Sequence, residues 1–273
     1  SDHRDSLSQL DSGWIQVYCE NAQEAMDMII QAYRIAEDPR VMTPFMVNLD
    51  GFILTHTYEM VDLPAQENVD RFLPPYRTAN RMDLDDPKTV CYAALDDYME
   101  FHLKQELDMR KVPGVIEEVE LEFKGIFGRS YGGLVEKYCC EDAEAVLMTL
   151  GSVTGTARAV VDAMRMEGKM VGLAKIRFMR PFPAAEIAGI AGNTKAMGIL
   201  DRDLSVGYEG IVFTNARSAV CEIESPPRMI NFIGGLGGRN ISKEDMRQIF
   251  DQLMQAARGE QGERVRFVNA RCE

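Results

Sequence analysis

Residues 169–182 read KMVGLAKIRFMRPF, a mainly apolar run that contains a few charged residues and ends near Pro181. Similar apolar runs occur at residues 145–150 and 196–200, and segments with helical periodicity lie between them. Short apolar strands that alternate with helices are typical of a parallel sheet with crossover helices. Ligands of such sheets bind beyond the carboxyl ends of the strands. We therefore expect function in the turns that follow, at residues 151–156, 177–183 and 201–210.

The same alternation predicts a doubly wound α/β domain over residues 135–257. Ser242 precedes the last helix as its N-cap, with Asp245 three residues later in a near capping box. The charged residues 258–273 are expected to form a loosely held tail. The predicted strands are residues 145–150, 170–178, 196–200 and 229–233, and the predicted helices are residues 154–167, 184–192, 211–221 and 243–257.

The first part of the chain is predicted to be the closing part of a second α/β domain, residues 1–62. A strand at residues 14–19 is followed by Asn21 as a helix cap, a helix at 22–36 and a strand at 43–49. Residues 63–134 are expected to form a proline-containing connector followed by bracing helices. The helices are predicted over residues 92–131, with an interruption at Pro113-Gly114.

The bulk composition narrows the possible partners. The 273 residues are 46% hydrophobic and carry a formal charge of −13, which repels nucleic acids and anionic membranes. The sequence has neither an apolar stretch long enough for a bilayer nor a secretory signal pattern, so we expect a cytoplasmic protein with no membrane partner. The six cysteines form no CxxC motif, so we expect reduced structural thiols and no iron–sulfur cluster or metal bound by this chain.

Four features could carry chemistry, and each also has a structural interpretation. Residues 151–156, GSVTGT, could bind phosphate at a helix N-terminus or form a plain tight turn. The glycine-rich residues 234–239 favour a contact role, with Arg239 projecting. The charged residues 201–203, DRD, could line a ligand site or face solvent. The histidines His3 and His56 could be catalytic or merely hydrogen-bonded.

Several strings match one family in order along the chain: DSGWIQVYCENAQEAMD, LDGFILTH, RFLPPY, LGSVTGTARAVVDAMRMEGKMVGLAKIRFMRPFP, ILDRD and FIGGLGGR. Together they resemble the alpha subunits of the pyruvate:ferredoxin oxidoreductase (pyruvate synthase) family, a branch of the 2-oxoacid:ferredoxin oxidoreductases. The resemblance implies the end of a pyrimidine-type thiamine-diphosphate domain followed by a transketolase-C-terminal-like domain. It covers nearly the whole chain.

The family's chemistry implies an enzyme subunit that is inactive alone. Thiamine diphosphate and Mg²⁺ would lie at the interface with a beta subunit, and the cofactor would act as the electron sink for decarboxylation. Coenzyme A and a 2-oxoacid would be the substrates, and ferredoxin the electron acceptor. The [4Fe–4S] clusters would belong to partner subunits of the beta, gamma and delta types.

The resemblance implies no catalytic residue within this sequence. The family's glutamate, threonine and substrate-gripping arginine are expected upstream of Ser1, so the chain is expected to be truncated, incomplete or split. Pyruvate is the default substrate, with oxalate, 2-oxoglutarate and branched-chain 2-oxoacids as alternatives. A flavodoxin-like binding module or a non-catalytic scaffold remains the alternative from another class. The candidate active-site or interface wall consists of Asp2, His3, Asp50, Phe52, His56, Gly235, Gly237, Gly238 and Arg239.

Overall fold

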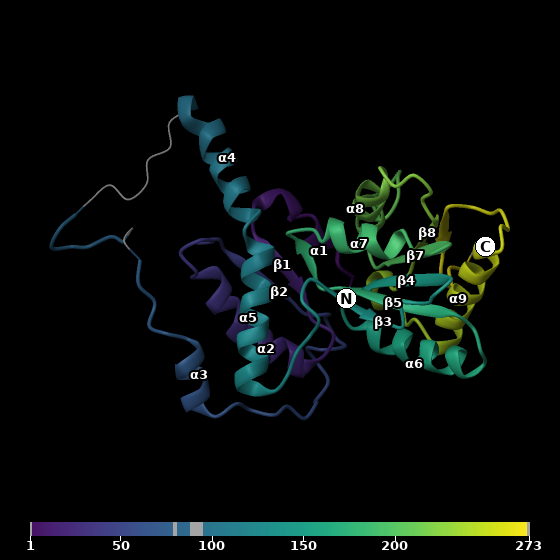
Figure 1. Ribbon diagram of the computed structural model, residues 1–273, viewed down its shortest axis with the longest axis horizontal. Helices are drawn as coiled ribbons and strands as arrows, with labels where there is room; N and C mark the ends of the chain where they lie inside the picture. The colour runs from purple at the N-terminus through teal and green to yellow at the C-terminus, as the bar shows by residue number, and fades with distance from the viewer. Residues whose placement is uncertain (1, 79–80, 88–94, 272–273) are drawn as a thin grey trace.

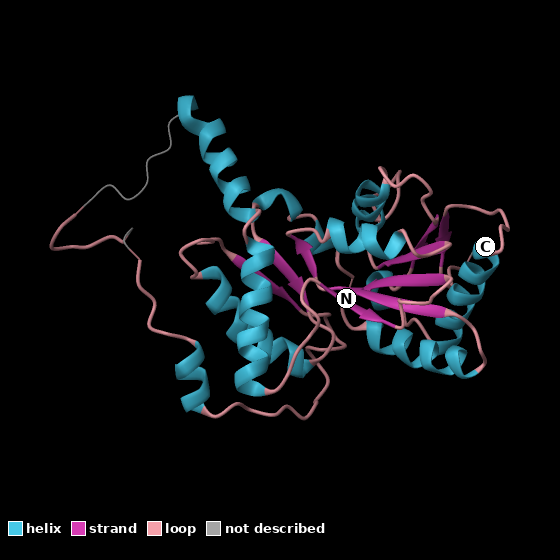
Figure 2. Cartoon of the chain, in the orientation of Figure 1, coloured by secondary structure: helices cyan, strands magenta, loops and turns pink. Residues whose placement is uncertain are grey.

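The chain forms two β-sheets, each covered by helices (Figures 1 and 2). The computed structural model describes residues 2–78, 81–87 and 95–271. In these residues the smaller sheet has the strand order β2-β1-β6 and the larger has the order β3-β5-β4-β7-β8-β9. The chain is thus the mixed α/β protein with parallel strands that the sequence predicts.

The smaller sheet is built from the predicted strand, helix and strand. Strands β1 (Ile15–Tyr18) and β2 (Phe45–Asn48) pair in parallel and are joined by α2 (Ala22–Ala36). The Asn21 side chain accepts a hydrogen bond from the backbone N–H of Glu24 at 2.9 Å, so the predicted cap is present. Strand β1 is completely buried between its neighbours.

The quoted stretch at residues 169–182 belongs to both sheets. One strand was expected at residues 170–178, but the structure has two: β5 (Val171–Ile176) in the larger sheet and β6 (Phe178–Arg180) in the smaller. Strand β6 pairs antiparallel with β1, with Val17 opposite Phe178. The chain changes sheets at Arg177, a charged residue that periodicity alone assigned to the strand.

The larger sheet has four central parallel strands at the predicted places: β5, β4 (Ala145–Leu150), β7 (Ala196–Asp201) and β8 (Arg228–Ile233). Two edge strands were not predicted. Strand β3 (Val135–Tyr138) runs antiparallel to β5, and β9 (Val265–Phe267) runs parallel to β8. The expectation of a loose tail is therefore wrong for residues 265–267, which complete the sheet.

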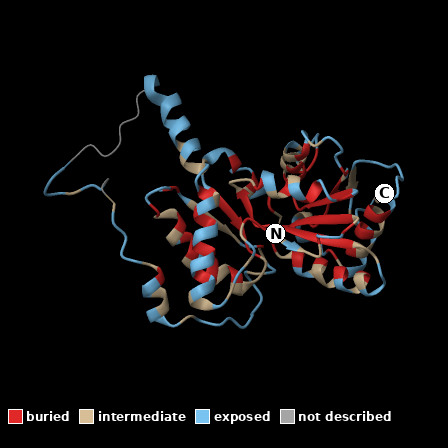
Figure 3. Ribbon diagram, viewed as in Figure 1, coloured by how far each residue is buried: buried red, intermediate tan, exposed pale blue. Residues whose placement is uncertain are grey.

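Helices cover both faces of the larger sheet, as a doubly wound domain requires. Helices α6 (Val153–Met166) and α9 (Lys243–Ala257) pack on one face, and α7 (Ala184–Ala191) and α8 (Ile211–Val220) pack on the other. Ser242 and Asp245 form the full capping box at the start of α9. The strands between the helices are the most buried part of the molecule (Figure 3).

The connector contains more structure than its composition suggested. The short helix α3 (Gln66–Phe72) was not predicted there, and neither was α1 (Arg4–Leu7) in the segment before β1. The expected helical region divides into α4 (Tyr98–Met109) and α5 (Val112–Phe127), and residues 92–94 of that prediction lie outside the described residues. The helix breaks at residues 110–111 rather than at Pro113, because proline fits the first turn of α5. Helix α5 packs its apolar face against α2 and α3.

Within the ranges that the structure describes, no helix combines the length and the apolar character needed to cross a bilayer.

Candidate functional site

The loop that follows β2 is fixed by the buried carboxylate of Asp50. This carboxylate lies 2.6 Å from His3 Nε2 and 2.6 Å from Arg202 Nη1, and it accepts hydrogen bonds from the backbone N–H of Ser152 at 2.7 Å and from the Ser152 hydroxyl. Burial alone would raise the pKa of the Asp50 carboxyl. The bond to His3 and the charge of Arg202 outweigh burial and hold this pKa far below its usual range.

Asp50 occupies the anion position that the sequence suggested for phosphate. Ser152 is the N-cap residue of α6, so its N–H points from the positive end of the helix toward the carboxylate. Gly151 before it has φ 74°, and a Cβ there would lie 2.9 Å from Asp50 Oδ2. The turn therefore binds an anion, as one of its two interpretations predicted, but that anion is a side chain of the same chain.

The contact between Asp50 and Ser152 lies at the topological switch point of the larger sheet. Strand β4 pairs with β5 on one side and β7 on the other, so the crevice lies where β4 and β7 end. Arg202 follows β7 and is 4% exposed, and its backbone carbonyl accepts a hydrogen bond from His3 N at 2.9 Å. A flavin or nucleotide phosphate in this crevice would have to displace Asp50, which weighs against the flavodoxin-like alternative.

The residues 201–203 are all buried, which excludes the interpretation that they face solvent. Asp201 accepts hydrogen bonds from the backbone N–H groups of Val212 and Phe213 at 2.9 and 3.2 Å, and so anchors the start of α8. Burial raises the pKa of Asp201 to about 7 in spite of these bonds. Asp201 thus has a structural role, whereas Arg202 joins the cluster at Asp50.

Phe52 and His56 lie on the outer side of the same loop. Their rings stack with centroids 4.7 Å apart, and the Phe52 ring is 67% exposed. Thr55 Oγ1 accepts a hydrogen bond from Phe52 N at 3.0 Å and lies 2.8 Å from His56 Nδ1, so one hydroxyl orders both residues. Phe52 has φ 66°, a conformation that costs a non-glycine residue about 1–2 kcal/mol. The loop therefore holds a strained, exposed aromatic pair above a buried anchor.

The glycine-rich loop lies beside the first residues of the chain. Gly237 N donates a hydrogen bond to Asp2 Oδ2 at 3.1 Å, and Gly238 follows with φ 81°. A Cβ at Gly235 would lie 3.0 Å from Arg202 Nε, so this glycine permits a close approach. Arg239, which was expected to project from this loop, is exposed, and its Nη1 donates a hydrogen bond to the carbonyl of Asn269 at 3.0 Å.

The structure thus brings together Asp2, His3, Asp50, Gly235 and Gly237 around Arg202. Phe52 and His56 share the loop of Asp50 but are exposed and make no contact with this cluster among those that the structure records for the described residues. No local pattern pairs Asp50 with Ser152 or Arg202, because these residues are about 100 and 150 positions away from Asp50 in the chain.

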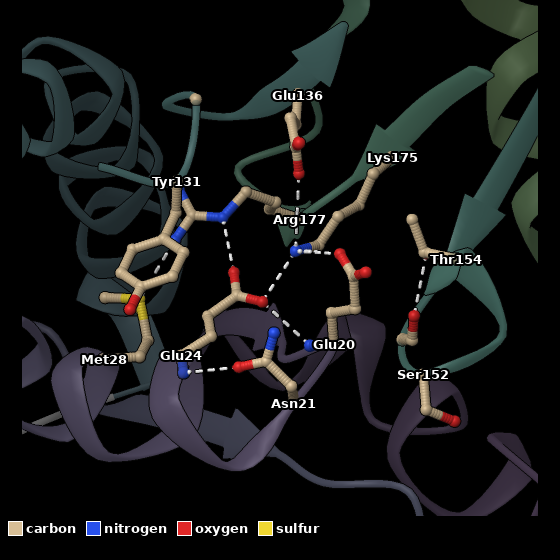
Figure 4. Close-up of polar contacts among 12 residues, drawn as sticks. Glu20, Asn21, Glu24, Met28, Tyr131, Glu136, Ser152, Thr154, Lys175 and Arg177 are labelled. Carbon is tan, nitrogen blue, oxygen red and sulfur yellow. Dashed lines mark hydrogen bonds and ion pairs between the residues drawn. The ribbon is translucent and has the colours of Figure 1, made fainter. Parts of the chain in front are cut away.

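A buried ion cluster was missed entirely (Figure 4). Glu24 of α2 accepts hydrogen bonds from Lys175 Nζ at 2.6 Å and Arg177 Nε at 2.8 Å, and Arg177 Nη1 also donates to Glu120 of α5 at 3.1 Å. Burial would raise the pKa of Glu24, but the two cations lower it overall. The signal in the sequence was present: Lys175 and Arg177 are charged residues within an apolar strand pattern. The cluster connects α2 and α5 to the larger sheet.

Strand β2 has a neighbour on one side only among the described residues. Beside its open edge lies a groove lined by α2 and β2, whose walls include Ile29, Tyr33, Phe45 and Val47. Ile29 and Tyr33 are half exposed, although a helix that covers a sheet normally buries such side chains. The smaller sheet is therefore open at β2.

Comparison with known proteins identifies the family. Residues 1–121 match the family model described as pyruvate flavodoxin/ferredoxin oxidoreductase, thiamine diP-binding, and residues 143–246 match pyruvate:ferredoxin oxidoreductase core domain II. The pyruvate synthase subunit PorA of Pyrococcus horikoshii is 40% identical over 279 residues, which cover 100% of this chain and 70% of the relative. The chain belongs to the pyruvate:ferredoxin oxidoreductase family. The resemblance drawn from the sequence is confirmed.

Other relatives of the pyruvate:ferredoxin oxidoreductase family extend this picture. PorA of Methanosarcina barkeri is 40% identical over 260 residues, which cover 94% of this chain and 65% of the relative. The ketoisovalerate oxidoreductase subunit VorA of Pyrococcus abyssi is 42% identical over 254 residues, which cover 92% of this chain and 64% of the relative. The chain thus spans about two thirds of the length of the curated relatives it matches.

A solved structure supports the fold. The 2-oxoglutarate:ferredoxin oxidoreductase from Magnetococcus marinus, with 2-oxoglutarate, coenzyme A and succinyl-CoA bound, superimposes with a TM-score of 0.56 at 14% sequence identity. The match covers 88% of this chain and 42% of that chain. At this identity the likeness shows a shared architecture.

The described residues fit one side of a thiamine-diphosphate site. An aromatic pair at the carboxyl end of β2 can form a wall against a flat ring. The helix N-terminus that could receive a diphosphate is filled by Asp50, and nowhere in the described ranges do three His, Cys, Asp or Glu side chains gather as metal ligands. The described residues could therefore contact the ring of thiamine diphosphate, whereas neither the helix N-terminus at Ser152 nor a cluster of metal ligands among them is available for its diphosphate and Mg²⁺.

Proposed function

We propose that this chain is the alpha-type component, or the C-terminal portion of it, of a thiamine-diphosphate-dependent 2-oxoacid:ferredoxin oxidoreductase. The complex would convert pyruvate and coenzyme A to acetyl-CoA and CO₂ with reduction of ferredoxin, or catalyse the reverse. The observation that carries this proposal is the match of residues 1–121 to the thiamine-binding family model, with the anchored loop of Asp50 inside the matched range.

In this proposal the chain provides a wall of a shared site. When bound, thiamine diphosphate would act as the electron sink for decarboxylation of the 2-oxoacid. Asp50 would hold the loop, and Phe52 and His56 would exclude water from the ring side of the site. Mg²⁺ and the diphosphate would be held at the interface with a beta-type subunit, and the [4Fe–4S] clusters in partner subunits of the beta, gamma and delta types.

The open edge of β2 supports the idea that the chain does not act alone. Its apolar groove and unpaired strand edge leave the smaller sheet short of a neighbour. About a third of each relative's length lies outside the part that this chain covers, so those additional residues are candidates for that neighbour. We expect the isolated chain to have no activity.

Pyruvate is the proposed substrate because PorA proteins are numerous among the relatives. A branched-chain 2-oxoacid is the second candidate, because VorA of Pyrococcus abyssi is equally similar to this chain. The two candidates are separated by assaying the native complex with each acid in the presence of coenzyme A and a low-potential viologen dye. Pyruvate should give the faster reduction of the dye, and reduction with 2-oxoisovalerate alone would exclude pyruvate.

The role of the loop is tested by Phe52→Gly in the assembled complex. Glycine suits the backbone conformation at this position, so folding should be retained while the aromatic wall is lost. We expect kcat/KM to fall by about tenfold, which corresponds to ~1.4 kcal/mol. Tyr208→Ala, which removes an exposed aromatic ring from another loop, is the control and should leave activity unchanged. Full activity of the Phe52→Gly complex would exclude the wall.

A further inference from the structure

Helix α4 carries an uncovered apolar stripe. Met99, Leu103 and Leu107 follow each other at four-residue spacing in α4 (Tyr98–Met109), which places their side chains along one side of the helix. Leu95 lies four residues before Met99, in the short 3₁₀ turn Leu95–Asp97 that precedes α4. Their exposed fractions are 94% for Leu95, 73% for Met99, 52% for Leu103 and 48% for Leu107. No residue of α4 is buried, and the N-terminal part of the helix extends away from the rest of the chain (Figures 1 and 3).

The body of the chain meets a different side of α4. Phe101, Gln105 and Asp108 line a groove together with Met42 and Pro44. In helical geometry these positions lie roughly opposite to Met99, Leu103 and Leu107. Within the part of the chain that the structure describes, the grooves that α4 lines with the body therefore leave the stripe uncovered.

The stripe is presented on a fixed base. Helix α4 leads through residues 110–111 into α5, whose Val112 and Val115 are fully buried in the core of the smaller sheet. The orientation of α4 is thus set before any partner binds. Preorganisation of this kind lowers the entropic cost of association.

The charges around the stripe indicate the kind of partner. Asp96, Asp97 and Glu100 flank the apolar side chains, and Lys104 is the one lysine or arginine within α4. Glu106 on the same helix is already paired with Arg110 at 2.8 Å. A second copy of this chain, with a net charge of −13, would bring like charges together at this surface. A partner with an apolar groove and a rim of lysine and arginine would match both the stripe and its borders.

We propose that the stripe of Leu95, Met99, Leu103 and Leu107 docks into an apolar, basic-rimmed groove on a different subunit of the same complex. This inference rests on the proposed function, because it takes the partner from the oxidoreductase complex. It adds a second attachment point, separate from the open edge of β2 and from the loop of Asp50.

The test uses the chain co-expressed with the beta-, gamma- and delta-type subunits of its complex. Met99→Glu/Leu103→Glu should weaken assembly at least tenfold, measured by native mass spectrometry and by subunit titration. Both side chains are exposed in the free chain, so the thermal midpoint of the isolated variant should stay at the wild-type value. Met166→Glu/Val206→Glu is the matched control, because these apolar side chains are equally exposed elsewhere, and it should assemble normally.

Charge reversal at the borders adds an independent measurement. Asp96→Lys/Glu100→Lys should weaken assembly and reduce its dependence on salt, because the variant loses its attraction to a basic rim. Wild-type affinity of the Met99→Glu/Leu103→Glu variant would overturn the docking proposal and leave the proposed function intact. A concentration-dependent dimer of the isolated chain that this variant abolishes would also overturn it, since a second copy would then cover the stripe. Failure of the wild-type chain to assemble with any of these subunits would overturn both proposals.

Discussion

Single residues decide what the strand ends can bind. The carboxylate of Asp50 accepts a hydrogen bond from Ser152 N at the N-terminus of α6 and pairs with Arg202, so both groups already have an anionic partner. An uncompensated charge in such a buried site is far more costly than the pair. The side chain of Asp50 therefore determines what can bind at this strand end.

Asp50→Ala should lower the free energy of unfolding by about 3–5 kcal/mol, because it removes the buried carboxylate that pairs with Arg202 and His3 and accepts a hydrogen bond from Ser152 N. Asp50→Asn should lose less, because an amide still accepts hydrogen bonds. Urea titration at pH 7 measures both losses. The lowered pKa of Asp50 means that its contribution is present above its ordinary pKa and is lost as the pH falls through the folded value. Asp11→Asn, at an exposed carboxylate, should have no measurable effect; an equal loss there would contradict the interpretation.

Asp201 should impose the opposite pH dependence. Its pKa rises from 3.8 to about 7 on folding, so the folded state holds the proton more tightly than the unfolded chain. Stability from this group is present below pH 4 and is lost as the pH rises through 7, at about 1.4 kcal/mol per pH unit. Asp201→Asn removes this group, so the stability difference between wild type and variant should change in favour of the variant from pH 5 to pH 8. A constant difference in urea titrations would show that Asp201 does not titrate in this range.

At the scale of elements, the helices and central strands follow from local signals. The cap at Asn21, the capping box at Ser242 and the apolar runs of β4 and β7 each act within a few residues. The two strands β3 and β9 and the change of sheet at Arg177 depend on partners elsewhere in the chain, which a local pattern does not contain.

The same limit applies to the site. The sequence singled out Asp50, His3 and the turn at residues 151–156 separately, and the structure joins them. Periodicity placed Lys175 and Arg177 within a strand but not beside Glu24, because that contact spans about 150 positions in the chain. Charged residues in an apolar strand were the available warning of a buried ion cluster.

The ion cluster connects elements of the two sheets, and its loss should be measurable. Glu24→Gln leaves Lys175 and Arg177 without their shared carboxylate, and we expect a loss of about 3–5 kcal/mol in urea titrations. Adding Lys175→Met should restore part of this loss, because it removes a buried cation that would retain only its longer contacts to Glu20 and Glu136, at 3.1 and 3.7 Å. The coupling between such neighbours is about 0.5–3 kcal/mol. Glu118→Gln, at the exposed ion pair with Arg40, is the control and should cause no measurable loss. Strict additivity of the two changes would contradict a coupled cluster.

At the scale of the whole molecule, the two sheets are linked by more than a connector. Strand β6 follows β5 directly but belongs to the smaller sheet, and the cluster at Glu24 lies at the same junction. A family model boundary between residues 121 and 143 therefore does not mark a mechanical boundary.

We expect the described parts of the chain to unfold together. Trp14 is the single tryptophan and precedes β1, so its fluorescence reports on the smaller sheet, whereas far-UV circular dichroism reports on both sheets. The two signals should give the same urea midpoint, because β6 cannot leave one sheet without disturbing the other. Separate midpoints would show that the sheets unfold independently.

The carboxylate of Asp50 at the start of α6 is, in effect, a tethered ligand. Its attachment to the chain gives it an effective concentration that dissolved anions at cellular levels do not reach. Added formate or acetate should therefore rescue the protein only when the carboxylate of residue 50 has been removed, as in Asp50→Ala. The carboxylate of Asp50 therefore occupies, at the N-terminus of α6 in the larger sheet's domain, the place where a dissolved anion would otherwise bind.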